Sequence, residues 1–285
     1  MTSLKLQAPA KINLSLRILG KRPDGFHEIK TTLCRIEISD SIDITRESRT
    51  TSTILTCSNP TIPVDESNLA LRALRLFEAE ARTQQAWRIH LEKRIPAGAG
   101  LGGGSSNAAA VLRGLNQLSG FPLSQEQLLL MAASLGSDIP FFLLDEPAAV
   151  GTGRGENVTP VAFPWRLPLV VIKPPFPIPT PWAYQKWAES KELRGVCYAP
   201  QLCPWGEMVN DLERPVFEKH LFLASLKSKL LESGHVMAAL MSGSGSTMFA
   251  VTKSAVAAEE LASQAREWCG STAFVEVTST VPSRA

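Results

Sequence analysis

PAGAGLGGGSSNAAAVLRGLN, residues 96–116, decides how this chain is expected to fold. Its first half is rich in glycine, and an alanine- and leucine-rich run follows without a break. Apolar residues of that run recur at intervals of three and four, the period of one helix face: Ala108, Val111, Leu112, Leu115 and Leu118. The stretch therefore predicts a glycine loop that leads directly into a helix beginning at Ser105 or Ser106.

Neither of two common phosphate-binding motifs describes this loop. Gly98, Gly100 and Gly103 match the GxGxxG spacing of dinucleotide-binding folds. Those folds also need an acidic residue about 20 positions later to hold a ribose, and residues 118–123 contain none. The GK[ST] ending of a P-loop is missing as well. These absences argue against a dehydrogenase and against a P-loop protein.

The loop is nevertheless suited to an anion. Glycines let backbone N–H groups converge, and the start of a helix directs unpaired donors and its positive dipole end to the same place. We therefore expect a phosphate group here. The hydroxyl groups of Ser105 and Ser106 are candidate ligands of the magnesium ion that accompanies a nucleoside triphosphate. A tight structural turn without a ligand is the alternative.

The residues before the loop predict strands and one helix. Residues 4–57 alternate apolar and polar side chains between short turns, which indicates a mainly antiparallel sheet. Lys11 and Asn13 lie two positions apart, so an ammonium and an amide share one face of a strand. A solvated strand face is the alternative role for this pair. Residues 67–82 predict a helix, with Ser67 as a possible N-cap.

After the helix that follows the loop, the sequence predicts a second helix and a shielded carboxylate. Ser124 and Gln127 have capping-box spacing, which indicates a helix over residues 124–135. In SLGSDIPFF, Asp138 lies between a glycine turn and an apolar segment that we interpret as a strand. Its carboxylate is expected to be partly shielded from water. Capping of the turn is the alternative role.

A proline-dense connector over residues 160–181 indicates two domains. We place the boundary near Val161, which gives domains over residues 1–160 and 161–285. A second glycine loop lies in MSGSGSTMFAV, residues 241–251. The second domain also has helical patterns that alternate with strands, over residues 181–191, 215–233 and 254–268. The whole pattern predicts an α+β protein.

Composition and charge exclude several classes of protein. The formal net charge is +2 and the cationic residues are spread along the chain, so a nucleic-acid surface is not expected. No apolar run approaches the roughly 20 residues that cross a bilayer, and the N-terminus lacks a signal-peptide pattern. The cysteines have no metal-binding spacing, which indicates free thiols in a reducing compartment. We expect a cytoplasmic monomer or weak homodimer that binds neither nucleic acid nor membrane.

Three segments resemble, in order and spacing, the motifs of the GHMP kinases, the superfamily of galactokinase, homoserine kinase, mevalonate kinase and phosphomevalonate kinase. These segments are PAKINLSLRILGKRPDGFHEI, PAGAGLGGGSSNAA and SGSGST. Together with GSDIPFF and PFPIPTPWAY, the extension RPDGFHEI is similar to the 4-diphosphocytidyl-2-C-methyl-D-erythritol kinases within that superfamily. The resemblance runs from about Ala8 to Val251. It implies an N-terminal domain like ribosomal protein S5 and a ferredoxin-like C-terminal domain.

The resemblance also implies an activity and its machinery. ATP would phosphorylate the 2-hydroxyl of a cytidine diphosphate-linked methylerythritol, in the non-mevalonate route to isoprenoid precursors. Asp138 matches the general base and Lys11 the cation that keeps it ionised. In-line placement and charge neutralisation would supply most of the rate enhancement. ATP and magnesium would bind Asn68 and Lys93 near adenine and ribose, and, around the phosphates, Pro96, Gly98, Gly100, Gly102, Gly103, Gly104, Ser105 and Ser106.

The cytidine end of the substrate is implied to lie between two aromatic rings. Phe26 and Tyr184 match the sandwiching positions, and His27 matches the residue that hydrogen-bonds the edge of the base. The family often has tyrosine at the position of Phe26, so a hydroxyl contact is missing here. Outside the resemblance, both rings would be ordinary core aromatics. The other implied substrate contacts, at the erythritol and the phosphates, are Asn13, Thr180, Gly243 and Ser244.

Two alternatives share the glycine loop. Another GHMP kinase, of the mevalonate or homoserine type, needs no pyrimidine pocket, so Phe26, His27 and Tyr184 discriminate against it. A nucleotide-binding regulator without activity needs no base, so Lys11 and Asp138 argue against it. The glycines of the second loop also fit a plain strand-to-strand turn.

Overall fold

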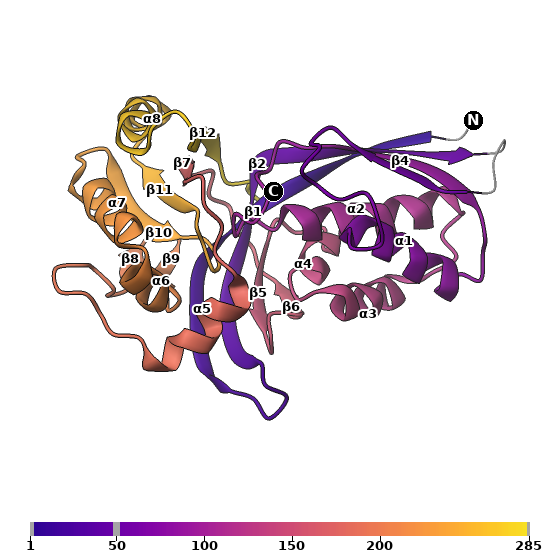
Figure 1. The fold of residues 1–285 in the computed structure, drawn as a ribbon, viewed down its shortest axis with the longest axis horizontal. Coiled ribbons are helices and arrows are strands. Elements are labelled where there is room, and N and C mark those ends of the chain that lie inside the picture. Colours follow the sequence, from indigo (N-terminus) through magenta and orange to yellow (C-terminus); the bar gives the residue numbers. More distant parts are fainter. Residues whose placement is uncertain (1–2, 48–51, 284–285) are drawn as a thin grey trace.

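The computed structural model describes residues 3–47 and 52–283 and shows two β-sheets with helices packed against them (Figure 1). Two long strands, β1 (Ser3–Lys21) and β2 (His27–Glu47), form an antiparallel hairpin through the middle of the molecule. Each of them is longer than the short strands expected here, because their pairing continues across bulges in both strands. The hairpin thereby connects the two halves of the fold.

The first sheet is built around this hairpin and is mainly antiparallel, as predicted. Its other strands are β3 (Ile54–Cys57), β4 (Ala86–Glu92), β5 (Ala148–Thr152), β6 (Asn157–Pro160), β8 (Gln201–Cys203) and β9 (Gly206–Asn210). The strand order is β3-β4-β2-β1-β9-β8, while β5 pairs with both β2 and β6. Only the pairs β3–β4 and β1–β9 are parallel among the described strands of this sheet.

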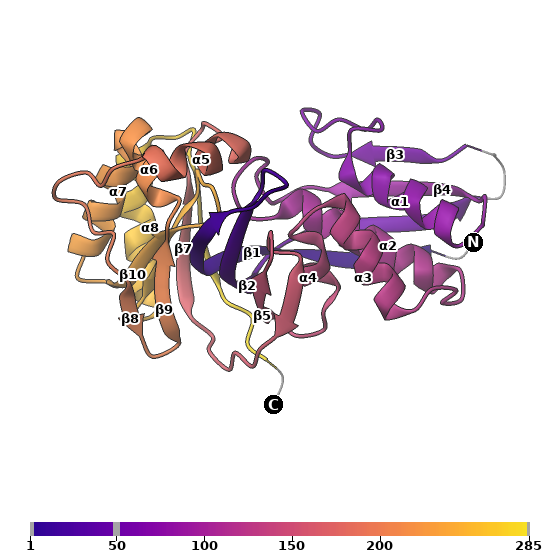
Figure 2. The same ribbon diagram turned by 90° about the horizontal axis from the view of Figure 1, so that it is seen from below.

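Helices cover one face of the first sheet (Figures 1 and 2). Apolar side chains between them form a core that includes the buried rings of Phe77, Trp87 and Phe141. Burial of one such side chain contributes about 1.5–3 kcal/mol. The helices are α1 (Leu69–Glu80), α2 (Gly103–Leu118), α3 (Gln125–Leu135) and α4 (Ile139–Leu143).

One predicted helix cap is confirmed and another is wrong. Ser124 and Gln127 form the expected capping box at the start of α3. Helix α1 is capped by Asn68 instead of Ser67, since the Asn68 side chain accepts a helix N–H at 2.9 Å. The Ser67 hydroxyl is taken up by Asp65, to which it donates at 2.6 Å.

The segments on either side of α3 also depart from the sequence expectation. Helix α2 begins at Gly103, before Ser105 and Ser106, so neither serine is its N-cap. The N-cap is Gly102, whose φ of 71° is a conformation that glycine adopts without strain. The apolar segment after Asp138 is the short helix α4, where we predicted a strand. Pro140 lies in its first turn, a position that tolerates a missing N–H group.

The second sheet is antiparallel, in the order β10-β11-β7-β12. Its strands are β7 (Pro168–Lys173), β10 (Val236–Met241), β11 (Met248–Thr252) and β12 (Phe274–Ser279). Its helices are α6 (Glu213–Lys219), α7 (Leu221–Glu232) and α8 (Ala255–Cys269). Helix α5 (Thr180–Lys186) lies beside the tip of the β1–β2 hairpin (Figures 1 and 2). The α+β class predicted from the sequence is confirmed.

The proposed boundary near Val161 falls in the segment between β6 and β7. Strands β8 and β9 come from beyond that boundary, yet β9 pairs with β1 in the first sheet. The division into residues 1–160 and 161–285 stays a prediction.

A buried ion pair joins two of the helices that pack with the second sheet. Lys227 of α7 and Glu213 of α6 contact each other, and each is 1% exposed. Glu213 also accepts the N–H of Met241 at 2.9 Å. Removing one partner leaves an uncompensated charge in the core, which costs about 3–5 kcal/mol. We expect Lys227→Met to lower the free energy of unfolding by this amount in urea titrations.

A double variant is the matched control for this pair. Glu213→Gln combined with Lys227→Met is neutral and keeps an acceptor for the Met241 N–H. It is expected to recover most of the lost stability, because no charge is left unpaired. A Lys227→Met single variant as stable as the wild-type chain would contradict this account.

Candidate active site

A cavity of about 450 Å³ is bordered by the β1–β2 hairpin, the glycine loop, the residue before α4, and α5. Residues far apart in the sequence meet there. The predicted site residues that line it are Lys11, Asn13, Phe26, His27, Gly100, Gly102, Ser105, Asp138, Thr180, Tyr184, Gly243 and Ser244.

The proposed base and its cation form an ion pair at the cavity wall. Lys11 Nζ lies 3.3 Å from Asp138 Oδ2. Lys11 also donates to Asn13 Oδ1 at 2.7 Å, and the Asn13 amide donates to Thr31 Oγ1 at 2.8 Å. Lys11 and Asn13 share one face of β1 as predicted, and each is 3% exposed. The alternative of a solvated strand face is therefore wrong.

The glycine loop is held between β1 and the second glycine loop. The carbonyl oxygen of Leu101 accepts the N–H of Lys11 at 3.0 Å, and that of Gly100 accepts the Ser242 hydroxyl at 3.0 Å. Gly100 has a φ of +75°, which glycine adopts without strain. Ser105, in the first turn of α2, lines the cavity. The unpaired N–H groups and positive dipole end of α2 are thus close to the cavity wall.

Other predicted nucleotide contacts are not among the described residues that line this cavity: Asn68, Lys93, Pro96, Gly98, Gly103, Gly104 and Ser106. The Lys93 ammonium contacts buried Asp40 and donates to Asn107 Oδ1 at 2.9 Å. Asp40 also accepts the backbone N–H groups of the two residues that follow Lys93, Arg94 at 2.7 Å and Ile95 at 2.9 Å. This network anchors the chain where it enters the glycine loop. The nucleotide contacts of these residues stay predictions.

Aromatic side chains line the part of the cavity near the hairpin tip. Phe26 is 52% exposed, so it is not a core aromatic. The rings of His27 and Tyr184 have centroids 5.4 Å apart. Burial, followed by the charge of Asp138, raises the pKa of Tyr184, so its phenol stays protonated. Burial, followed by the charge of Lys21, lowers the pKa of His27, which favours a neutral imidazole.

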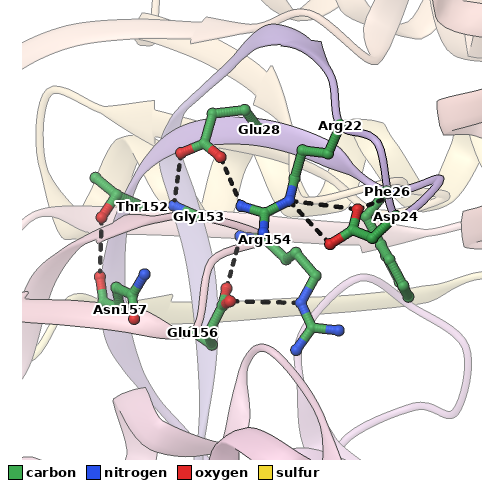
Figure 3. Close-up of polar contacts among 9 residues, drawn as sticks. All are labelled: Arg22, Asp24, Phe26, Glu28, Thr152, Gly153, Arg154, Glu156 and Asn157. Atoms are coloured by element: carbon green, nitrogen blue, oxygen red, sulfur yellow. Dashed lines mark hydrogen bonds and ion pairs between the residues drawn. The ribbon is translucent and has the colours of Figure 1, made fainter.

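Sequence reasoning missed Arg154, which also lines the cavity. Its guanidinium carbon lies 4.8 Å from the centre of the Phe26 ring. Glu156 holds it, accepting its Nε at 3.4 Å and its backbone N–H at 2.6 Å (Figure 3). Glu28, on β2, accepts the N–H of Gly153 at 3.1 Å (Figure 3). In the sequence this arginine lies in GTGRGE, whose pattern predicts only a turn.

The second glycine loop reaches the same cavity. The hydroxyl groups of Thr180 and Ser244 lie 2.7 Å apart and share a hydrogen bond. The Asn210 amide donates to the carbonyl oxygen of Gly243 at 2.8 Å. The loop therefore connects β10 to β11 and also borders the cavity beside α5.

Comparisons with known proteins agree with this geometry. Two family models match: "GHMP kinases N terminal domain" over residues 68–146 and "GHMP kinases C terminal" over residues 201–271. A Methylacidiphilum infernorum protein named 4-diphosphocytidyl-2-C-methyl-D-erythritol kinase is 45% identical over 86% of this chain and 84% of the relative. This chain belongs to the family of 4-diphosphocytidyl-2-C-methyl-D-erythritol kinases, within the GHMP kinases.

Solved structures confirm the GHMP kinase fold. A crystal structure of 4-(cytidine 5'-diphospho)-2C-methyl-D-erythritol kinase matches with a TM-score of 0.80 at 33% identity, covering 98% of this chain and 100% of the other. L. major mevalonate kinase matches with a TM-score of 0.71 at 15% identity, covering 100% and 98%, which shows the fold alone. As a GHMP kinase, the chain is an ATP-dependent kinase of a small molecule.

Residues 3–47 and 52–283 of this GHMP kinase lack two features. None of the helices there combines the length and the apolar character that a membrane crossing requires. The same residues contain no group of three or more histidine, cysteine, aspartate or glutamate side chains that could hold a metal ion.

Proposed function

We propose that this chain transfers the γ-phosphoryl group of ATP to the 2-hydroxyl of 4-diphosphocytidyl-2-C-methyl-D-erythritol, giving ADP, in the non-mevalonate route to isoprenoid precursors. The cavity carries the proposal, because it joins the Lys11–Asp138 pair to Phe26, His27 and Tyr184. A carboxylate beside an ammonium suits proton removal from an alcohol, and aromatic rings suit a pyrimidine. The likeness to relatives named for this activity supports it.

In this proposal Asp138 accepts the proton of the attacking hydroxyl. Lys11, whose Nζ lies 3.3 Å from Asp138 Oδ2, pairs with the carboxylate and polarises the hydroxyl. Asn13 fixes the Lys11 ammonium through their 2.7 Å hydrogen bond. The N–H groups at the start of α2 bind the phosphates. Most of the rate enhancement comes from in-line placement of the two substrates and from neutralised phosphate charge.

The residues at the start of α2 fit magnesium. The Ser106 hydroxyl is buried without a hydrogen-bond partner among the described residues, and Ser105 lines the cavity. A hydroxyl with a free lone pair can ligate this ion. We therefore assign both serines as its protein ligands, and the ion would neutralise phosphate charge. Asn68 and Lys93 stay assigned to the adenine and ribose side.

The cytidine is proposed to lie between Phe26 and Tyr184. A neutral His27 can hydrogen-bond the edge of the base. The guanidinium group of Arg154 lies over the Phe26 ring and holds this exposed aromatic side chain in place. The proposed contacts of the erythritol and the diphosphate are Asn13, Thr180, Gly243 and Ser244.

The organisation of the protein belongs to the same proposal. We propose two domains, residues 1–160 and 161–285. We also propose that the chain works in the cytoplasm as a monomer or weak homodimer.

A coupled assay of ADP release tests the proposed function. The purified chain is given ATP and, in parallel, the cytidylated methylerythritol, mevalonate and homoserine. We expect turnover of the first acceptor to exceed that of the others by several orders of magnitude, because only it fills the aromatic part of the cavity. Preferred turnover of mevalonate or homoserine would favour another GHMP kinase activity. ATP binding without ADP release from any acceptor would favour a regulator.

Tyr184→Ala is expected to weaken the binding of the cytidylated substrate but not that of ATP. Stacking of one base on an aromatic ring contributes about 1–3 kcal/mol, so the KM for this substrate should rise about 5- to 150-fold. The KM for ATP should change by less than about threefold, because the glycine loop is untouched. Steady-state kinetics with each substrate varied measure both constants. Tyr184→Phe keeps the ring and is the matched control, whereas equal changes in both constants would count against the pyrimidine assignment.

A further inference from the structure

The proposed base is carried by a very short helix. Asp138 is the residue immediately before α4, which has five residues. An isolated helix of this length is not stable in water, and its last carbonyl groups have no partner within the helix. Whatever holds α4 in place therefore also holds the carboxylate of Asp138.

Two arginines from distant elements contact the C-terminal end of α4. Arg35, on β2, donates from Nη2 to the carbonyl oxygen of Leu144 at 2.6 Å. Arg113, on α2, donates to the carbonyl oxygens of Leu143 and Leu144 at 2.9 and 3.3 Å. Helix α3 adds the amide of Gln125, which donates to Leu143 at 2.9 Å. Cations at this end also interact favourably with the helix dipole.

Strand pairing links one of these arginines to the proposed active site. Lys11 of β1 is the direct cross-strand partner of Arg35 on β2, so both side chains point to the same face of the sheet. Lys11 contacts Asp138 at the beginning of α4, and Arg35 contacts the carbonyl groups at its end. One cross-strand pair of cations thus holds both ends of the helix.

The two guanidinium groups remain together despite their like charge. Both donate to the carbonyl oxygen of Leu144. Burial, followed by the charge of Arg113, lowers the pKa of Arg35 to about 10, which leaves it protonated at neutral pH. If α4 had only a structural role, apolar contacts could hold it without the repulsion between two guanidinium groups.

We propose that Arg35 and Arg113 are positioning residues for phosphoryl transfer: by fixing the carbonyl end of α4, they keep the Asp138 carboxylate beside Lys11. The inference rests on the proposed role of Asp138 as the base. Neither arginine is among the described residues that line the cavity, so each acts through the helix. A misplacement of about 1 Å at the reacting groups can cost about 100-fold in rate.

Arg113→Met tests the proposal first. The variant keeps an unbranched stem at an exposed position and removes the hydrogen bonds to α4. We expect kcat to fall about 10- to 100-fold, with the KM for ATP and for the cytidylated substrate within about threefold of wild type. Arg72→Met, which replaces an exposed arginine of α1, is the matched control and should leave kcat unchanged.

The decisive measurement repeats Arg113→Met in the Asp138→Asn chain under single-turnover conditions. If Arg113 acts through the carboxylate, the Arg113→Met substitution should lower the remaining rate of the Asp138→Asn chain by no more than about twofold. An equal loss in both backgrounds, or a wild-type kcat for Arg113→Met alone, would overturn the inference and leave the proposed function intact. Undiminished turnover of Asp138→Asn alone would overturn the assignment of Asp138 as the base, and this inference with it, while the proposed phosphoryl transfer would stand.

A second variant covers a failure of Arg113→Met to fold, which thermal denaturation would reveal. Gln125→Leu removes the third donor from an exposed position at the start of α3. It should lower kcat by about twofold to tenfold at unchanged KM, and this loss should be absent in the Asp138→Asn background. A loss of the same size in both backgrounds would overturn the proposal.

Discussion

Asp138→Asn is expected to lower kcat by about 100-fold or more, which is the usual scale for the loss of a general base. The amide keeps the size of the carboxylate but accepts a proton poorly. Lys11 retains its 2.7 Å hydrogen bond to Asn13, so the cation stays in place. The dissociation constant for ATP should remain within about twofold, because the glycine loop is unchanged. Stopped-flow or coupled ADP-release kinetics and calorimetric ATP binding measure the two quantities separately.

Asp43→Asn is a matched control for that variant. Asp43 is a partly exposed carboxylate on β2 that pairs with Lys5 at 3.7 Å. Such a surface pair contributes about 1 kcal/mol or less, and its loss should leave kcat at the wild-type value. If Asp138→Asn behaved like Asp43→Asn, the general base would have to be sought elsewhere in the cavity.

Local sequence patterns predicted those elements whose structure depends on neighbouring residues. The capping box of Ser124 and Gln127 needs only residues three positions apart. The shared strand face of Lys11 and Asn13 follows from the period of a strand, and the structure adds only that both are buried. The glycine loop before α2 was located for the same reason, although its helix begins slightly earlier than expected.

Distant contacts decided the elements that the sequence did not predict. The segment IPFFL is short and uniformly apolar, so its periodicity cannot distinguish a strand from a helix. In the fold it is helical, and Arg35 and Arg113 bind its last carbonyl groups from other elements. Strand β9 likewise pairs with β1, nearly two hundred positions earlier in the chain. No local window contains either interaction.

The same limit applies to the candidate site. Residues with a motif around them, such as Asp138 and His27, could be proposed from the sequence. Arg154 could not, because its relation to Phe26 exists only once β5 and β6 lie beside the β1–β2 hairpin. The contact of Lys93 could not be predicted either, since it joins the residue after β4 to Asp40 of β2, more than fifty positions earlier in the chain.

Gly100→Ala is expected to lower kcat/KM for ATP by about 100-fold or more. At Gly100 the backbone has a φ of +75°, and an added methyl group would overlap the carbonyl oxygen of Ser242. Because that oxygen belongs to the backbone, the overlap can be relieved only if one of the two glycine loops moves. A shift of about 1 Å in the groups that hold the phosphates is enough for this loss of rate. Steady-state kinetics with ATP varied measure it.

Gly120→Ala separates this overlap from the effect of backbone conformation. Gly120 has a φ of +80°, close to that of Gly100, but an added methyl group there meets nothing within 4 Å. Both variants should therefore lose about 1–2 kcal/mol of stability from the left-handed conformation alone. Only Gly100→Ala should also lose activity, since only there must a loop move. If Gly100→Ala kept a wild-type KM and kcat, the position of this loop could not matter to the phosphates, and its assignment as the ATP site would be wrong.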